Sequence, residues 1–237
     1  AFLSPNSLSP KNQNSYQHDP CPCGSGQKFK KCCIDKGIPN TKNKFDLMIF
    51  KVAKFMLENN DVEACNVWFK VWDSLKQKIT PEIKSIEELD EKYSGQESIF
   101  NWCQDLEMTL GNVGQDNPEF HEKRIEFCHE FVELLPESNK LVIENMRRAE
   151  AESLFAIGKW EEGEKAFALL AKDFPESAWV YIGWGDMYCL FRNNEKIPLD
   201  YEKAEKLYRE ALTKELNKSD KKSVLERLAD LEDQKKA

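Results

Sequence analysis

Apolar side chains recur at helical spacing from Lys44 almost to the C-terminus, and this feature constrains the fold most. Apolar residues three or four positions apart lie on one face of an α-helix, where they can be buried together. One such stripe holds Val62, Cys65, Phe69 and Trp72. A second, with one arginine as its single polar member, holds Phe120, Arg124, Phe127, Phe131 and Leu134. These patterns predict amphipathic helices.

Helix-breaking residues separate the stripes. Proline ends a helix, and asparagine, serine or aspartate caps the start of the next one. Such breaks fall at Asn59-Asn60, Thr80-Pro81, Ser94-Gly95, Asn117-Pro118, Pro136-Glu137-Ser138, Pro175-Glu176-Ser177 and from Asn217 to Asp220. Because no sustained alternation predicts strands and the loops are short, we expect an all-α fold of nine or ten helices, paired as antiparallel hairpins.

We expect four segments along the 237 residues. Residues 1–16 are rich in proline, serine and asparagine without apolar periodicity, which predicts a flexible leader. Residues 17–37 form a cysteine-rich module that a run of turn-forming residues joins to the first long helix. Residues 44–140 form helical hairpins, and residues 141–237 form repeated hairpins closed by a capping helix from Ser223 to Lys236.

Four of the eight cysteines crowd into one short run as Cys21, Cys23, Cys32 and Cys33. A segment this short cannot hold a hydrophobic core, whereas four thiolates at about 2.3 Å satisfy tetrahedral zinc and metal binding supplies the folding free energy. We therefore predict one structural zinc ion. A redox dithiol or a disulfide is the alternative, although adjacent Cys32 and Cys33 cannot easily bridge each other. The nearby His18 is not needed as a ligand, because four thiols fill the tetrahedron.

The residues between these cysteines suit a metal site. Gly24 and Gly26 let the backbone turn sharply, so that amide groups can approach the sulfur atoms. Four thiolates on one zinc carry a net charge of about −2, and nearby lysines offset it while leaving a basic rim. The rim and the aromatic residue that would cover the metal are Lys28, Phe29, Lys30 and Lys31.

The run from Asp19 to Cys33 resembles the SEC-C motif, the zinc-binding motif at the C-terminus of SecA, the preprotein translocase ATPase. The resemblance implies that Cys21, Cys23 and Cys32 bind the metal together with Cys33, which stands where the family has histidine or cysteine. In SecA this appendage docks the chaperone SecB and acidic surfaces. The resemblance therefore implies protein partners related to chaperones or translocation, but it does not include the ATPase.

The last part of the chain resembles the tetratricopeptide repeat. Pro136 and Pro175 are each followed by Glu-Ser, as if they close units of about 40 residues. The matching positions are Leu154, Gly158, Trp160, Phe167, Leu170, Pro175, Tyr181, Trp184, Gly185, Tyr188, Tyr201, Ala204, Tyr208 and Ala211. The segment from Arg192 to Leu199 is an insertion relative to that family. We therefore expect a tetratricopeptide-like α-solenoid preceded by a small irregular zinc-binding knuckle.

Small and large residues in the better-matching unit support this expectation physically. Gly185 and Ala204 would let two helices approach closely, with Trp184 and Tyr208 filling the space around them.

The repeat resemblance also implies a groove, lined by the first helix of each hairpin, that binds peptides or partner helices. It places six residues there: Asn145, Arg148, Glu152, Trp179, Ile182 and Asp186. Residues 47–237 hold 27 Lys plus Arg and 39 Asp plus Glu, a net charge of −12. This balance favours a basic or neutral partner and disfavours nucleic acid on the helical surface.

The N-terminal part has the opposite charge. Residues 1–46 hold seven lysines and three aspartates, a net charge of +4. Basic zinc modules with an aromatic residue can contact phosphates and stack on bases. Association of residues 17–37 with nucleic acid or the ribosome is therefore the alternative to protein binding.

Enzyme signatures are absent from the sequence. There is no phosphate-binding glycine loop, no Gly-x-Ser-x-Gly elbow and no His-Glu-x-x-His pair. We expect His121 and His129 to lie on a charged helix face, and the Glu-rich runs 130–137 and 161–164 to be solvated. The chain is thus predicted to be a non-enzymatic adaptor. Since it begins with alanine, an accessory part of a larger enzyme with an upstream active domain is a further alternative.

The remaining cysteines and the lack of membrane signals indicate the compartment. Cysteines scattered on apolar helix faces are small buried hydrophobes in a reducing environment. These are Cys65, Cys103, Cys128 and Cys189. No apolar run approaches the roughly 20 residues of a membrane span, and the start lacks the features of a signal peptide. We expect a bacterial cytoplasmic protein.

Overall fold

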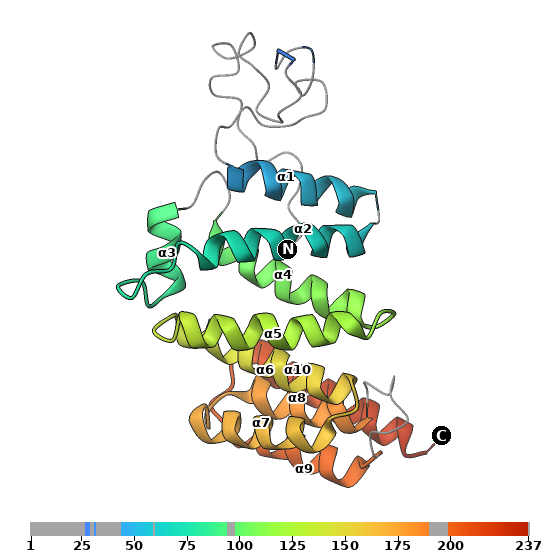
Figure 1. Ribbon diagram of the computed structural model, residues 1–237. Coiled ribbons are helices and arrows are strands. Elements are labelled where there is room, and N and C mark those ends of the chain that lie inside the picture. The colour runs from blue at the N-terminus through green and yellow to red at the C-terminus, as the bar shows by residue number, and fades with distance from the viewer. Residues whose placement is uncertain are drawn as a thin grey trace. The chain divides into compact units, whose positions relative to one another are not determined.

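The computed structural model describes residues 27–28, 31, 44–58, 60–93, 98–189 and 199–236 (Figure 1). Ten α-helices form in these residues, which confirms the all-α prediction and the expected number of helices. They are α1 (Lys44–Leu57), α2 (Asp61–Lys76), α3 (Ile86–Tyr93), α4 (Ile99–Gly114), α5 (Glu119–Leu134), α6 (Lys140–Ala156), α7 (Trp160–Asp173), α8 (Ala178–Cys189), α9 (Tyr201–Ala211) and α10 (Lys218–Gln234). The predicted leader, nearly all of the cysteine-rich module and most of the insertion lie outside the described residues.

Local capping chemistry sets several helix starts at the predicted breaks. The side chain of Asn60 accepts a hydrogen bond from the backbone of Glu63 at the start of α2. Asn139 caps α6, and Asn217 caps α10 through the backbone amide of Asp220 at 2.9 Å. Each cap satisfies one of the amide groups that a helix start leaves without an intrahelical partner. The capping helix therefore begins at Lys218, earlier than the sequence suggested.

The chain divides into two compact units. The first consists of Ala1–Lys78 with Ser94–Ser98, and in it α1 packs against α2. The second consists of Ile79–Tyr93 with Ile99–Ala237 and contains α3 to α10. The functional-site residues that the sequence predicted within helices all lie in the second unit. The predicted division at residue 140 stays a prediction.

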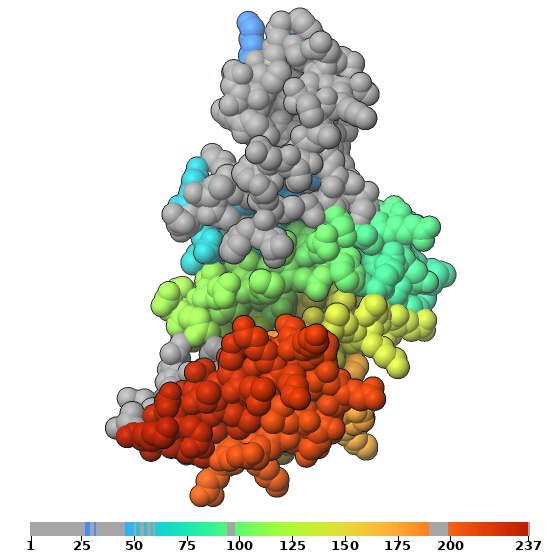
Figure 2. All heavy atoms as spheres, turned by 180° about the vertical axis from the view of Figure 1, so that it is seen from behind, coloured from blue at the N-terminus to red at the C-terminus, as the bar shows by residue number. Residues whose placement is uncertain are grey.

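Adjacent helices of the second unit pack as pairs, as the short loops predicted. In addition, α4 contacts α6, α6 contacts α8, and α8 contacts α10. The alternate helices α5, α7 and α9 make no such contacts with one another among the described residues. Helices α4, α6, α8 and α10 thus form one layer of the second unit. Figure 2 shows α10, in the red range of the bar, at the surface of this unit beside α9.

Helix α8 is buried on nearly all sides. Ten of its 12 residues are buried, because α6, α7, α9 and α10 all pack against it. Its sequence, AWVYIGWGDMYC, has a single charged residue, as expected for a helix without a solvated face. This helix is the centre of the second unit's core.

Close helix approach at Gly185 confirms the physical interpretation of this pair of helices. A Cβ atom at Gly185 would lie 2.6 Å from the Cε1 atom of Tyr208 on α9, so no larger residue fits without movement. Ala204 is fully buried at the same junction. Beside it, the ring of Trp184 stacks on Phe167 with centroids 5.8 Å apart.

The scattered cysteines are all buried, as predicted: Cys65, Cys103, Cys128 and Cys189. Burial raises the pKa of Cys103 and of Cys128, which keeps both thiols protonated and unreactive. Among the described residues, no helix combines the length and apolar character needed to cross a membrane.

Candidate functional site

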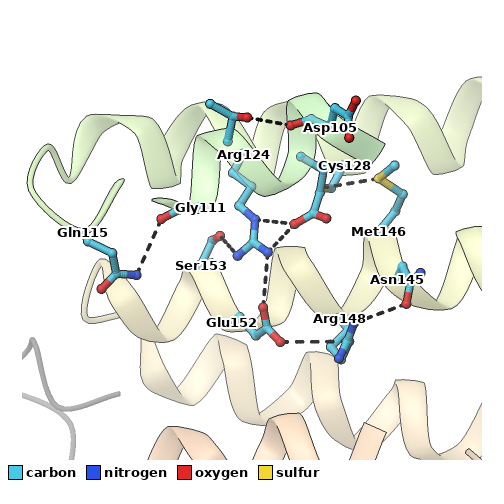
Figure 3. Close-up of polar contacts among 12 residues, drawn as sticks. Asp105, Gly111, Gln115, Arg124, Cys128, Asn145, Met146, Arg148, Glu152 and Ser153 are labelled. Carbon is cyan, nitrogen blue, oxygen red and sulfur yellow. Dashed lines mark hydrogen bonds and ion pairs between the residues drawn. The ribbon is translucent and has the colours of Figure 1, made fainter. Parts of the chain in front are cut away.

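Three of the predicted groove residues lie together on one face of α6 (Figure 3). Asn145, Arg148 and Glu152 follow one another at helical spacing, so their side chains meet along that face. Arg148 donates a hydrogen bond from Nη2 to Oδ1 of Asn145 at 3.2 Å. Its Nε atom lies 3.9 Å from Oε1 of Glu152. These three residues, which the repeat resemblance assigned to one groove, thus lie together on α6.

Glu152 also binds Arg124, which reaches it from α5 (Figure 3). Nη2 of Arg124 lies 3.2 Å from Oε2 of Glu152, and its Nε donates to Oε1 of Glu107 on α4 at 2.7 Å. Nη1 donates to Oγ of Ser153 at 3.3 Å. One guanidinium therefore joins α4, α5 and α6.

Arg124 and Glu107 are largely withdrawn from water, with side chains 12% and 11% exposed. Burial opposes the charge of Arg124, but Glu107 and Glu152 more than offset this effect and raise its pKa. Arg124 was the single polar member of an apolar stripe. A lone arginine on an apolar helix face can indicate a buried ion pair, but this pair was not among the predictions from the sequence.

Trp179 extends this cluster to α8 and α10. Its ring centroid lies 5.8 Å from the guanidinium carbon of Arg148, and the side chain is 38% exposed. Its Nε1 atom donates to Oδ1 of Asp220 at 3.1 Å. The predicted residues Asn145, Arg148 and Trp179 are thus neighbours at the border of α6, α8 and α10.

The other two predicted groove residues lie inside the protein. Ile182 is 1% exposed and belongs to the core. Asp186 is 4% exposed; its carboxylate accepts hydrogen bonds from the hydroxyl of Tyr208 at 2.6 Å and from Nε of Arg227 at 2.9 Å. Burial raises the pKa of Asp186, while these two partners lower it. Asp186 therefore ties α8 to α9 and α10, because α8 has no solvated face to present.

The two histidines of α5 have different environments. His129 is exposed, and its Nδ1 lies 3.6 Å from Oε1 of Glu150. His121 is 5% exposed, and its ring packs against Gly114. Burial and the nearby Arg124 lower the pKa of His121 to about 4. The expectation of a solvated face is therefore wrong for His121, which is a neutral core residue.

Glu164, in the run that was expected to be solvated, also joins several helices. Its carboxylate accepts hydrogen bonds from Nε1 of Trp184 and the hydroxyl of Tyr188 on α8. It also pairs with Nζ of Lys203 on α9 at 2.5 Å. Its neighbours in the run, residues 161 and 162, are exposed as expected.

The predicted zinc ligands lie outside the described residues: Cys21, Cys23, Cys32 and Cys33. Phe29 and Lys30 lie outside them as well. Lys28 and Lys31 are described and exposed, and the backbone amide of Lys31 donates to the carbonyl of Lys28 at 2.9 Å. Within the described part of the chain, no group of His, Cys, Asp or Glu side chains could hold a metal ion.

Comparison with known proteins assigns the cysteine-rich segment. A family model described as the SEC-C motif matches residues 19–34. Residues 19–34 are a SEC-C motif. The protein translocase subunit SecA of Syntrophus aciditrophicus (strain SB) is 53% identical over 32 residues. This match covers 14% of the chain but only 4% of that SecA. No solved structure matches the chain.

The SEC-C motif is typically metal-binding. Its four cysteines fall within residues 19–34, and thiolates are the donors that structural zinc prefers. The similarity to SecA extends over 32 residues, a small part of the chain.

Proposed function

We propose that the chain is a non-enzymatic adaptor, in which the SEC-C motif is a zinc-stabilised protein-binding module attached to a helical scaffold. The observation that carries this proposal is the SEC-C motif itself at residues 19–34. Motif and helices would bind separate sites, and their linkage would raise the effective concentration of each at its target.

One zinc ion would be held by Cys21, Cys23, Cys32 and Cys33 of the motif. Four thiolates complete a tetrahedral shell and leave no position for water or substrate, so the metal would stabilise the module rather than catalyse a reaction. The lysines around the site offset its negative charge and remain available to a partner.

The helical part would act as a tetratricopeptide-like α-solenoid. Support comes from the contacts of α4 with α6, α6 with α8 and α8 with α10, since stacked hairpins bring alternate helices into one layer. The exposed residues of this layer would be open to a partner segment, whereas most of α8 is buried. Of the six predicted groove residues, Asn145, Arg148, Glu152 and Trp179 are at least partly exposed.

The partners would be chaperones or components of protein translocation in the cytoplasm. The likeness to SecA supports this choice, although it covers a small fraction of that protein. Direct binding of purified SecB to the full chain, lost in the Cys21→Ser/Cys32→Ser variant, would support it. If the wild type and the cysteine variant bind SecB equally well, the SecB contact lies outside the motif.

Association with the ribosome or with RNA is a second candidate, favoured by the net charge of +4 on residues 1–46. Binding of this kind falls steeply with added salt because counterions are released from phosphates. Replacing Lys28, Lys30 and Lys31 by alanine would abolish it. Co-sedimentation with ribosomes at low salt that persists in this variant would contradict an RNA contact through the motif.

Metal content and folding together test the zinc proposal. Elemental analysis should give one zinc per chain for the wild type and none for Cys21→Ser/Cys32→Ser, while circular dichroism shows the same helix content in both. If freshly reduced protein contains no metal, the zinc proposal is refuted and the redox dithiol or disulfide becomes the better interpretation of the four cysteines.

A further inference from the structure

Helix α10 is held to the second unit by few apolar side chains. Two of its 17 residues are buried, Val224 and Leu231, and Leu228 is partly buried against the same core. In α8, by contrast, ten of 12 residues are buried. Within the described part of the second unit, α10 packs only on α8 and α9. Because hydrophobic stabilisation grows with the apolar area removed from water, it holds α10 far less firmly than α8.

A largely buried polar contact fixes α10 on α8. Nε of Arg227 donates to both carboxylate oxygens of Asp186, at 2.9 and 3.2 Å. The side chain of Asp186 is 6% exposed and that of Arg227 is 32% exposed. A charge-assisted hydrogen bond is strengthened where water is largely excluded. Two further contacts of α10 with α8 and α9 lie at the surface: Asp220 with Trp179 and Lys235 with Glu205.

A buried polar cluster on α8 and α9 adjoins this contact. The hydroxyl of Tyr208 donates to Asp186 at 2.6 Å and lies 3.1 Å from Sγ of Cys189. Tyr208 is fully buried and Cys189 is 3% exposed. Burial raises the pKa of the Cys189 thiol, and Arg227 and Asp230 of α10 act on this pKa in opposite directions. The two charges of α10 therefore lie near the thiol as well as near the carboxylate.

We propose that α10 is a lid, which detaches from α8 and α9 as a unit while α3 to α9 stay folded, and that the contact between Arg227 and Asp186 is its latch. A helix that buries little apolar surface opens at a smaller free-energy cost than the core of its unit. The open form exposes Asp186, Tyr208 and Cys189 to water, together with the part of the core that α10 covers. The closed form hides this surface. The inference goes beyond the proposed adaptor function and does not depend on the zinc motif.

Hydrogen exchange of the full chain, followed by mass spectrometry, tests the opening without any substitution. Amides in the middle of α10 should exchange at least about tenfold faster than amides in α8, because opening of the lid leaves α8 helical. Equal exchange rates in the two helices would show that α8 and α10 open together, which overturns the inference.

Alkylation of Cys189 distinguishes detachment of α10 from fraying in place, because this thiol lies on α8. With iodoacetamide and peptide mapping of the full chain, Arg227→Met should raise the rate of Cys189 labelling at least about tenfold, the factor expected when a hydrogen bond to a charged group is lost. Lys222→Met is the matched control. Lys222 also lies on α10, but it pairs with Glu226 of the same helix and both side chains are mostly exposed. Labelling in this control should stay within about twofold of the wild type.

The other buried thiols of the second unit report whether α3 to α9 stay folded. Cys103 on α4 and Cys128 on α5 are fully buried. Both should remain unlabelled while Cys189 reacts. Labelling of Cys128 as fast as Cys189 would mean that the whole unit opens. A Cys189 rate that Arg227→Met leaves unchanged would mean that α10 does not protect the thiol, and either result overturns the inference.

Discussion

Removal of the Arg124 guanidinium tests whether the ion pair between α4 and α5 holds the second unit together. In Arg124→Met, the carboxylate of Glu107 would stay nearly buried without the cation that now lies within hydrogen-bonding distance. Breaking a buried pair in this way costs about 3–5 kcal/mol of unfolding free energy. The methionine keeps most of the packing volume, so the loss reports the charge.

The pH dependence gives this prediction its magnitude. An abandoned carboxylate can escape the burial cost by taking up a proton, and an ordinary glutamate has a pKa of about 4.3. Protonation then costs about 4 kcal/mol at pH 7 but only about 1 kcal/mol at pH 5. The destabilisation of Arg124→Met should therefore be about 3–4 kcal/mol at neutral pH. It should shrink to about 1 kcal/mol at pH 5, because the folded variant binds the extra proton.

Urea unfolding followed by far-UV circular dichroism at both pH values measures this loss. The double variant Arg124→Met/Glu107→Met should recover most of the stability, since an apolar pair of similar volume often replaces a buried ion pair without cost. Arg209→Met, at a side chain that is 65% exposed, should cost less than about 1 kcal/mol. A loss below about 1 kcal/mol for Arg124→Met at neutral pH would refute the reasoning.

Three further predictions use other parts of the chain. Gly185→Ala should lower the unfolding free energy by about 1–3 kcal/mol, seen as a lower melting temperature, because the new methyl group would overlap the ring of Tyr208. Burial lowers the pKa of His121 from about 6.5 to about 4, so as the pH falls the unfolded chain takes up a proton at this residue at a higher pH than the folded chain does. On the order of 3 kcal/mol of unfolding free energy should therefore be lost as the pH falls from about 6.5 to about 4. His121→Leu should abolish this loss, while His129→Leu should leave it unchanged. Chelation of zinc should remove the metal without changing the helical circular dichroism signal, and a collapse of that signal would show that the helices need the metal.

The helices and their starts could be predicted because local chemistry determines them. Asn60 and Asn217 cap helices with their own side chains, and each acts on an amide three positions away. The close approach at Gly185 was also predictable, since a glycine among large aromatic residues marks a junction that needs room. The two caps depend on residues within one turn of the chain, and the approach at Gly185 joins two helices that follow each other in the sequence.

The sequence did not predict which residues of α8 are exposed. Periodicity identifies the buried face of a helix only when a polar face contrasts with it, and α8 offers almost no contrast. Its repeat positions therefore suggested a groove at Ile182 and Asp186, both of which are buried. The lack of polar residues was itself the signal that other helices surround α8.

The sequence alone predicts the zinc module better than the helical surface. The reason is that the side chains of the helical surface pair with residues on other helices. The donors of the SEC-C motif lie within one short run, so their chemistry can be recognised without knowing the fold. Arg124 and Glu107 are 17 residues apart, and Arg148 and Trp179 lie on different helices. Their partnership depends on which helices pack together. The repeat resemblance named Arg148 and Trp179, but only the packing of α6 with α8 and of α8 with α10 shows that their side chains meet.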